Sequence, residues 1–160
     1  MKTKLNPVWQ VVSIGLIAGM RSALAPAIAS HMLNRNKSKQ LIKSPIEFVQ
    51  SDITATVLKV CAAGELVADK LPFAPSRTEA AGVAARVISG GFSGGTLAKS
   101  NGKNGWMGAM LGATAALAAT YACYYLRKGI VNGLGVHDPI IGAAEDVLAL
   151  GAGLALMRSA

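Results

Sequence analysis

Charged side chains and aromatic rings are both scarce in this sequence. Asp, Glu, Lys and Arg make up 15% of its 160 residues and Phe, Trp and Tyr 5%, whereas hydrophobic residues make up 52%. Soluble domains carry about 25% charged residues, so the composition argues against an ordinary soluble domain of this length. The apolar excess is mostly Ala, Gly, Leu and Val, which suits membrane helices that approach closely through small residues. We expect one all-α integral membrane domain over residues 1–160, with a soluble all-helical protein as the alternative.

Residue types that react with substrates or bind metals are scarce as well. The chain has two cysteines, Cys61 and Cys123, and two histidines, His31 and His137. Both cysteines lie inside apolar segments, where small packing residues are more common than a disulfide or a metal pair. Neither histidine has a second His, a Cys or a carboxylate at ligand spacing on the same face. Because the sequence also holds no nucleophile motif and no phosphate loop, we expect no metal, no cofactor and no enzymatic activity.

Acidic residues are half as numerous as basic ones. The 8 Asp and Glu against 16 Lys and Arg give a net charge of +8, which in a soluble chain would suggest binding to nucleic acid. Here most of the Lys and Arg fall between apolar segments, where basic residues act as topology signals during membrane insertion. We therefore expect the lipid bilayer as a partner and no nucleic acid.

Five helix starts follow from capping residues. Asn6 and Asp138 each precede a proline, Ser44 and Ser76 each open a Ser-x-x-Glu box, and Asn104 precedes the fifth start. The implied helices span residues 7–33, 45–71, 77–99, 105–128 and 139–157. Because a helix needs about 20 residues to cross a bilayer core, these segments predict a bundle of about five transmembrane helices rich in Gly and Ala.

The first helix has two features that complicate a simple crossing. Its lysine-led, apolar start resembles a secretory signal, but the apolar pattern continues to Leu33 and so favours a spanning segment. Pro26 removes a backbone hydrogen bond and predicts a kink just beyond Arg21, with a re-entrant hairpin as the alternative.

A short proline-containing loop separates the second and third helices. Pro72 and Pro75 stiffen it, and the Ser76 capping box begins the next helix at once. We therefore expect the second and third helices to form a tight antiparallel hairpin.

Six of the charged residues within the predicted helices form our candidate site: Arg21, Glu65, Asp69, Arg86, Glu145 and Asp146. If every helix crosses once, helix geometry places Glu65 and Glu145 about 9 Å from the same surface, so the charges gather in one half of the membrane. An isolated charge inside a membrane costs at least about 2.5–3.5 kcal/mol. We therefore expect Arg21 and Arg86 each to lie within hydrogen-bond reach of one of the four carboxylates.

This charged cluster has two interpretations. One is a polar cavity that binds a small ion or polar solute. Because four acids face two arginines, this cavity would favour a cation or a proton. Lys70 and Arg77 would lie at the mouth of the cavity. The other is a set of static ion pairs that hold the helices in register. The first interpretation predicts a carrier or channel-like protein, and the second predicts a structural or assembly protein.

Glycine pairs at a spacing of four residues predict close helix packing. The pairs are Gly15 and Gly19, Gly90 and Gly94, Gly91 and Gly95, and Gly108 and Gly112. Such small-xxx-small faces serve either packing within one chain, which we favour, or a homodimer.

Orientation stays open at this stage. Five crossings leave six Lys and Arg on one side of the membrane and seven on the other. The basic cluster from Arg35 to Lys43 favours its own side as the cytoplasmic one. The alternative is dual topology with an antiparallel homodimer.

Four groups of residues in this sequence together resemble the pattern of a known family. They are Gly19-Met20-Arg21-Ser22 with Pro26; Glu65-x-x-x-Asp69-Lys70-x-Pro72 with Ser76-Arg77-Thr78; Arg86 with the glycines that follow it; and Glu145-Asp146. In these groups the chain resembles the DUF4126 family, a domain of unknown function in small bacterial membrane proteins. The resemblance covers most of the chain. It implies a fold in the bacterial inner membrane and the same choice of site residues, and it implies no activity, because the family has none established.

Overall fold

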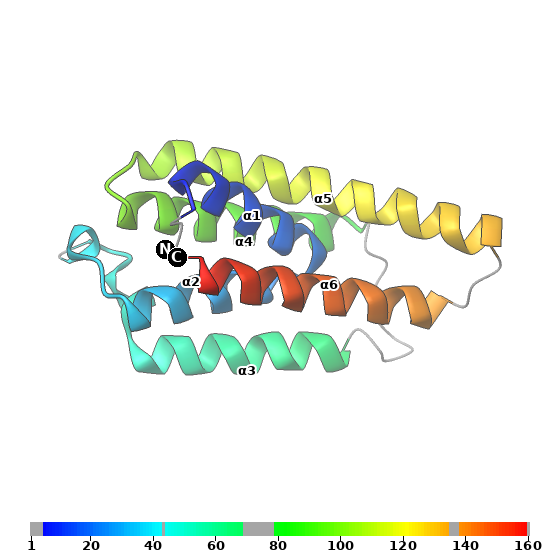
Figure 1. Cartoon of the computed structure of the whole chain (residues 1–160), viewed down its shortest axis with the longest axis horizontal. Coiled ribbons are helices and arrows are strands. Elements are labelled where there is room, and N and C mark those ends of the chain that lie inside the picture. Colours follow the sequence, from blue (N-terminus) through cyan, green and yellow to red (C-terminus); the bar gives the residue numbers. More distant parts are fainter. Residues whose placement is uncertain (1–4, 43, 69–78, 135–137, 160) are drawn as a thin grey trace.

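A computed structural model describes residues 5–42, 44–68, 79–134 and 138–159 of the chain. Over these ranges the protein is all-α, with two short 3₁₀ turns and no strand, as Figure 1 shows. The elements are α1 (Pro7–Met20), α2 (Leu24–Arg35), η1 (Lys39–Leu41), η2 (Glu47–Gln50), α3 (Asp52–Ala68), α4 (Ala80–Ser100), α5 (Gly105–Leu134) and α6 (Asp138–Arg158).

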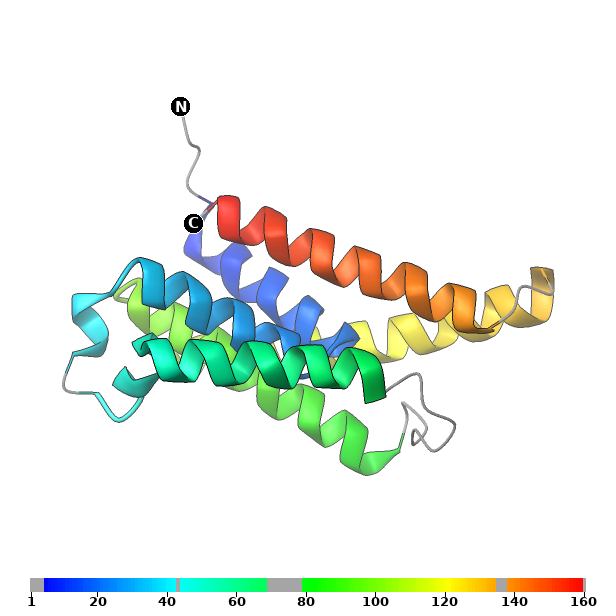
Figure 2. The same cartoon turned by 90° about the horizontal axis from the view of Figure 1, so that it is seen from below.

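The first predicted helix, residues 7–33, is in fact two helices joined as a hairpin. α1 ends at Met20, Arg21 has extended backbone angles (φ −142°, ψ 113°), and α2 begins at Leu24. α2 then runs back beside α1, so that the start of α1 and the end of α2 lie at the same end of the molecule (Figure 2). There they line one groove. A single crossing by this segment was therefore the wrong prediction, and the hairpin alternative has the right geometry. Pro26 does not cause the break, because it lies in the first turn of α2, where proline is tolerated.

Two of the predicted capping residues are confirmed. Asn6 Oδ1 accepts a hydrogen bond of 3.0 Å from the Val8 amide, and Asn104 Oδ1 accepts one of 2.9 Å from the Trp106 amide. The helix start predicted at Ser44 is wrong, since the chain from Ser44 onward forms turns and η2, and α3 begins only at Asp52. The capping side chain of α3 is Ser51, whose Oγ accepts from the Thr54 amide at 3.1 Å.

Tertiary packing explains why α3 begins late. Val49 in η2 and Leu41 in η1 are fully buried, and the Val49 carbonyl accepts a 2.6 Å hydrogen bond from Ser30 Oγ of α2. Burying Val49 against α2 and Leu41 against α4 stabilises two short turns where local sequence alone favours a longer helix.

Helices α1, α4 and α5 pack against one another through glycine. A Cβ atom built on Gly94 would lie 2.7 Å from the Gly108 carbonyl oxygen, and one on Gly15 would lie 2.5 Å from the Gly112 carbonyl oxygen. Real side chains do not approach backbone this closely, so only glycine permits these separations. The glycine-bearing faces of α1, α4 and α5 are thus in contact within a single chain.

Gly112→Leu is expected to separate α4 from α5 and to lower the melting temperature of the purified protein by about 10 °C or more, because overpacking at a helix contact costs at least about 1–3 kcal/mol. Gly151→Leu is the matched control, since a Cβ at Gly151 on α6 meets nothing within 4 Å. Equal melting temperatures for the two variants would contradict this packing.

The predicted tight hairpin of the second and third helices is wrong. α3 packs mainly on α2, whereas α4 packs on α5, α1 and α2. The glycine face of α4 is occupied by α5, and α3 is drawn to the start of α2 by a side-chain contact described below. The proline loop itself, residues 72–78, lies outside the described residues.

Two described helical segments are long and apolar enough to cross a membrane, Gly105–Val131 with 27 residues and Ile140–Arg158 with 19. α3 has 17 residues and includes Lys59 and Glu65, and α4 is rich in Gly and Ser, which contribute little hydropathy. The expected all-α architecture is therefore present over the described residues. Five single crossings are not confirmed, because the first segment turns back and two of the described helices meet the length and composition of a span.

Candidate functional site

The tip of the α1–α2 hairpin, Arg21-Ser22-Ala23, is the point where the predicted site residues meet. The Glu65 carboxylate of α3 accepts three hydrogen bonds there: from the Ser22 amide at 2.9 Å, from Ser22 Oγ at 2.7 Å and from the Ala23 amide at 2.7 Å. The first amides of a helix have no partner within it, and a negative charge at that end is favoured by the helix dipole. Glu65 therefore caps α2 from another helix.

Two further helices satisfy the carbonyl groups on either side of the break. Ser89 Oγ of α4 donates to the Ser22 carbonyl oxygen. Thr120 Oγ1 of α5 is 3.2 Å from the Gly19 carbonyl oxygen and 2.8 Å from the Ala116 carbonyl oxygen, so its one proton is shared between them. A broken helix buried in protein must have these backbone groups satisfied, and here polar side chains of α3, α4 and α5 do so.

The side chain of Arg21 points to the remaining long helix. Arg21 is 3% exposed and pairs with Asp146 of α6, which is 8% exposed. The prediction that Arg21 lies within reach of one of the four carboxylates is thus confirmed. All four long helices, α3 to α6, contribute one polar side chain to this tip.

Glu145, the neighbour of Asp146, faces a residue that the sequence argument did not include. Its Oε2 lies 3.9 Å from Arg127 Nη1 of α5, at the outer limit of an ion pair. Arg127 lies at the end of the predicted helix 105–128 and was not among the six candidate residues, whereas α5 continues to Leu134.

The other arginine of the predicted site is also buried. Arg86 is 8% exposed on α4, one turn before Ser89. Its predicted pairing with a carboxylate stays a prediction. Asp69, together with the predicted mouth residues Lys70 and Arg77, lies outside the described residues.

A comparison with protein families decides which family the chain belongs to. The family model described as a domain of unknown function (DUF4126) matches residues 8–158. The chain is a member of the DUF4126 family. No curated protein and no solved structure matches it. The DUF4126 match includes every residue of the hairpin tip and every residue that contacts it, and it assigns no activity to them.

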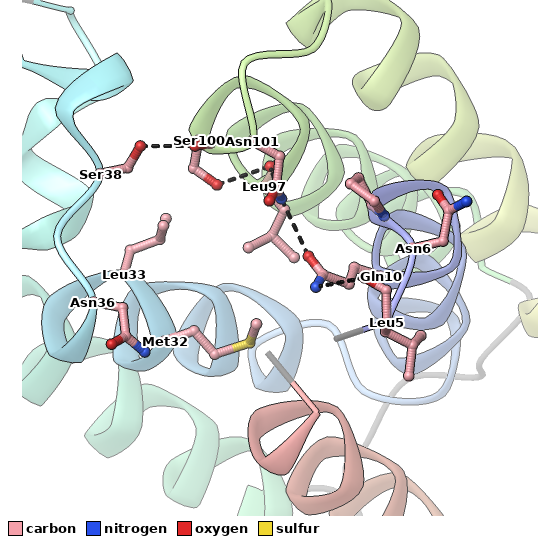
Figure 3. A pocket seen from close by; sticks show the side chains of 11 residues that line it. Leu5, Asn6, Gln10, Met32, Leu33, Asn36, Ser38, Leu97, Ser100 and Asn101 are labelled. Carbon is pink, nitrogen blue, oxygen red and sulfur yellow. Dashed lines mark hydrogen bonds between the residues drawn. The ribbon is translucent and has the colours of Figure 1, made fainter. Parts of the chain in front are cut away.

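A groove lies at the opposite end of the hairpin in this DUF4126 chain (Figure 3). It has a volume of about 540 Å³, within the usual range for small-molecule sites. Its lining comes from the start of α1, the end of α2 and the end of α4, with residues next to them: Leu5, Asn6, Pro7, Gln10, Met32, Leu33, Asn36, Ser38, Leu97, Ser100 and Asn101. Sequence reasoning missed this groove, because it forms only once α2 turns back beside α1.

Hydrogen bonds across the groove hold its walls together. Asn101 Nδ2 donates to Gln10 Oε1 at 3.1 Å, and Ser38 Oγ donates to the Ser100 carbonyl oxygen at 2.7 Å. These bonds join the start of α1 and the segment after α2 to the end of α4 (Figure 3). Amides and hydroxyls thus line a groove that carries no charged side chain among its lining residues.

Among the described residues no group of three or more His, Cys, Asp and Glu is placed to hold a metal ion. The carboxylates at the tip are instead engaged with backbone amides and guanidinium groups. The described groups at this site can make hydrogen bonds and can change ionic partners within buried pairs.

Proposed function

We propose that this protein is an integral membrane protein that carries a small cation or a proton through the charged tip of its α1–α2 hairpin. The observation that carries the proposal is the helix break itself. Irregular backbone at membrane depth is tolerated only where protein or a polar cavity satisfies it, and broken helices beside charged residues are typical of transport sites. Here one break is bound by polar side chains of four other helices.

Outward-facing side chains support a membrane environment for the whole bundle. Large apolar residues are exposed along α3 to α6, among them Ile53 at 77%, Val60 at 67%, Trp106 at 80% and Leu148 at 64%. A soluble monomer rarely exposes apolar surface over so many elements, whereas lipid requires it.

Aromatic residues on α5 support a bilayer of ordinary thickness. Trp106 and Tyr125 are both exposed, near opposite ends of the apolar part of that helix, and the rise between them is about 28 Å. A hydrocarbon core is about 30 Å thick, with Trp and Tyr at its two interfaces. Along α5, Thr120, which touches the tip, lies about 21 Å from the membrane interface at Trp106 and about 8 Å from the interface at Tyr125.

The hairpin changes the count of basic residues on each side. Because α2 returns to the end where α1 begins, six described Lys and Arg lie near the groove end of the bundle: Arg35, Lys37, Lys39, Lys99, Lys103 and Arg158. Two lie near the other end, Arg127 and Lys128. The positive-inside rule then favours a cytoplasmic groove end.

Both termini are therefore expected in the cytoplasm. A fluorescent protein that folds only inside the cell and a phosphatase that is active only outside, each fused in turn to either terminus, measure this directly. We expect fluorescence and no phosphatase activity from both ends. Opposite results at the two ends would contradict the hairpin, because five single crossings place the termini on opposite sides.

The charges of the tip suggest how a cation could enter. Among the described residues three carboxylates, Glu65, Glu145 and Asp146, share this region with three guanidinium groups, those of Arg21, Arg86 and Arg127. These charges balance, so any excess of negative charge at the site would have to come from the fourth predicted carboxylate, Asp69. A cation or proton would bind by displacing Arg21 from Asp146, since the buried carboxylate needs a positive partner in either state.

One observation favours the alternative, a structural membrane protein. Both oxygens of Glu65 are engaged by the hairpin tip, so this carboxylate acts as a fixed cap rather than a ligand. A homodimer also stays a prediction, and any small-residue dimer face would have to lie away from the glycines that join α1, α4 and α5.

Flux measurements separate the carrier from the structural protein. Purified protein is reconstituted in liposomes, and the entry of H⁺, Na⁺, K⁺ and small organic cations is compared with entry into protein-free liposomes. The carrier predicts saturable entry of at least one of them. Liposomes that behave alike with every cation would overturn the proposal in favour of the structural alternative.

A further inference from the structure

One face of α4 carries a line of hydroxyl groups between the groove and the tip. The line follows Arg86 along the chain and consists of Ser89, Ser93, Thr96 and Ser100. These residues are spaced three or four apart, which places them on one face of the helix. Ser89 bonds the hairpin tip, and Ser100 lines the groove. The two ends of the line are about 16 Å apart, and both touch the α1–α2 hairpin or its continuation.

The middle of this line is fully enclosed. Ser93 is 0% exposed and Thr96 is 1% exposed. Thr96 Oγ1 donates to the Phe92 carbonyl oxygen at 2.7 Å, but Ser93 Oγ has no hydrogen-bond partner in the part of the chain that the structure describes. Buried hydroxyls are nearly always paired with protein, water or a ligand, so Ser93 Oγ retains the capacity to bond one water molecule.

The surroundings of this line limit what can pass. Most buried side chains of the hairpin between groove and tip are apolar, among them Ile14, Ile17 and Ile28. The buried hydroxyl of Ser30 is engaged by the Val49 carbonyl oxygen. A hydrated metal ion would lose its water there without gaining a charged or carbonyl-rich ligand set. A proton needs only hydroxyls and water, since each can accept one proton and donate another.

We propose that the α4 hydroxyl line is a proton path between the groove and the Arg21–Asp146 pair, with a water molecule bound at Ser93 Oγ. In each step a hydroxyl or water oxygen accepts a proton from one neighbour and gives its own to the next, so that every group ends unchanged and one proton has moved. The inference rests on the proposed carrier function and names the proton as the ion that enters from the groove end.

Proton flux tests the path. Liposomes loaded with a pH-sensitive dye and driven by a potassium diffusion potential report proton entry through wild-type protein and its variants. Ser93→Val, which replaces the hydroxyl with a methyl group, is expected to lower the rate by about tenfold or more, and Ser93→Thr, which retains a hydroxyl, to keep most of it. Thr114→Val is the matched control, because Thr114 is an exposed hydroxyl on α5, off this line, and we expect no change in its rate.

Thiol labelling tests access to Ser93 without any flux. In a Cys61→Ala, Cys123→Ala background, Ser93→Cys is expected to react with methanethiosulfonate-ethylammonium about tenfold faster than Ala149→Cys, an equally buried position on α6. Equal rates would overturn the path while leaving the carrier proposal open to another route. Fast labelling with no proton flux through the wild type would overturn proton conduction, and any saturable flux of another cation would still support the carrier. Absence of every flux would overturn both.

Discussion

Glu65→Gln is expected to lower the melting temperature of the purified protein by about 5–10 °C, since hydrogen bonds to a charged group contribute about 1.5–3 kcal/mol. Glu65 accepts three hydrogen bonds at the hairpin tip, two from backbone amides at the start of α2. The glutamine has one acceptor oxygen, and its amide group would face a backbone N–H that also donates. Loss of the charge removes the favourable interaction with the α2 dipole as well.

Glu79→Gln is the matched control for this substitution. Glu79 is an exposed carboxylate at the start of α4 and makes no capping hydrogen bond with its side chain, so we expect a melting temperature within about 1 °C of wild type. Differential scanning fluorimetry in one detergent suffices for both variants. If Glu65→Gln melts with the wild type, Glu65 does not hold the tip.

Arg21→Leu and Asp146→Leu are each expected to destabilise the protein by about 3–5 kcal/mol, because either change leaves the other charge buried without its partner. Arg21 is 3% exposed and Asp146 is 8% exposed, so solvent cannot replace the lost contact. The double variant is expected to be more stable than either single variant, since it removes both charges together. Chemical denaturation of all four proteins completes the double-mutant cycle.

Arg127→Leu provides the comparison within the same region. Its closest contact to Glu145 is 3.9 Å and its side chain is 22% exposed, so screening by solvent should reduce its effect to less than about half that of Arg21→Leu.

In the double-mutant cycle, strictly additive effects of Arg21→Leu and Asp146→Leu would contradict the ion pair.

The residues of the site were easier to predict than the path of the chain that brings them together. Arg21, Glu65, Arg86, Glu145 and Asp146 stand out because charge is costly in an apolar segment, and each of them is buried or engaged at the tip. Their partners Ser22, Ser89 and Thr120 carry no such signal. A serine or threonine in a membrane helix usually bonds its own backbone, so only the position of another helix shows that it does otherwise.

The hairpin could not be predicted with certainty from local sequence. The stretch from Pro7 to Leu33 contains no Asp, Glu, Lys or Arg other than Arg21, and its break has no proline or positive-φ glycine at Arg21-Ser22-Ala23. The break is stabilised instead by hydrogen bonds from residues at least 42 positions away along the chain. Non-local side chains thus determine where α1 ends, and the expected orientation changes with it.

In the proposed carrier, the Arg21–Asp146 pair at the hairpin tip exchanges its internal cation, the Arg21 guanidinium, for a carried one. The most direct measurement is cation and proton uptake by liposomes containing the Arg21→Leu, Asp146→Leu double variant, which we expect to fold, compared with wild-type liposomes at equal protein content. We expect saturable uptake by the wild type and uptake at the protein-free rate by the double variant. Uptake by the double variant at the wild-type rate would contradict it.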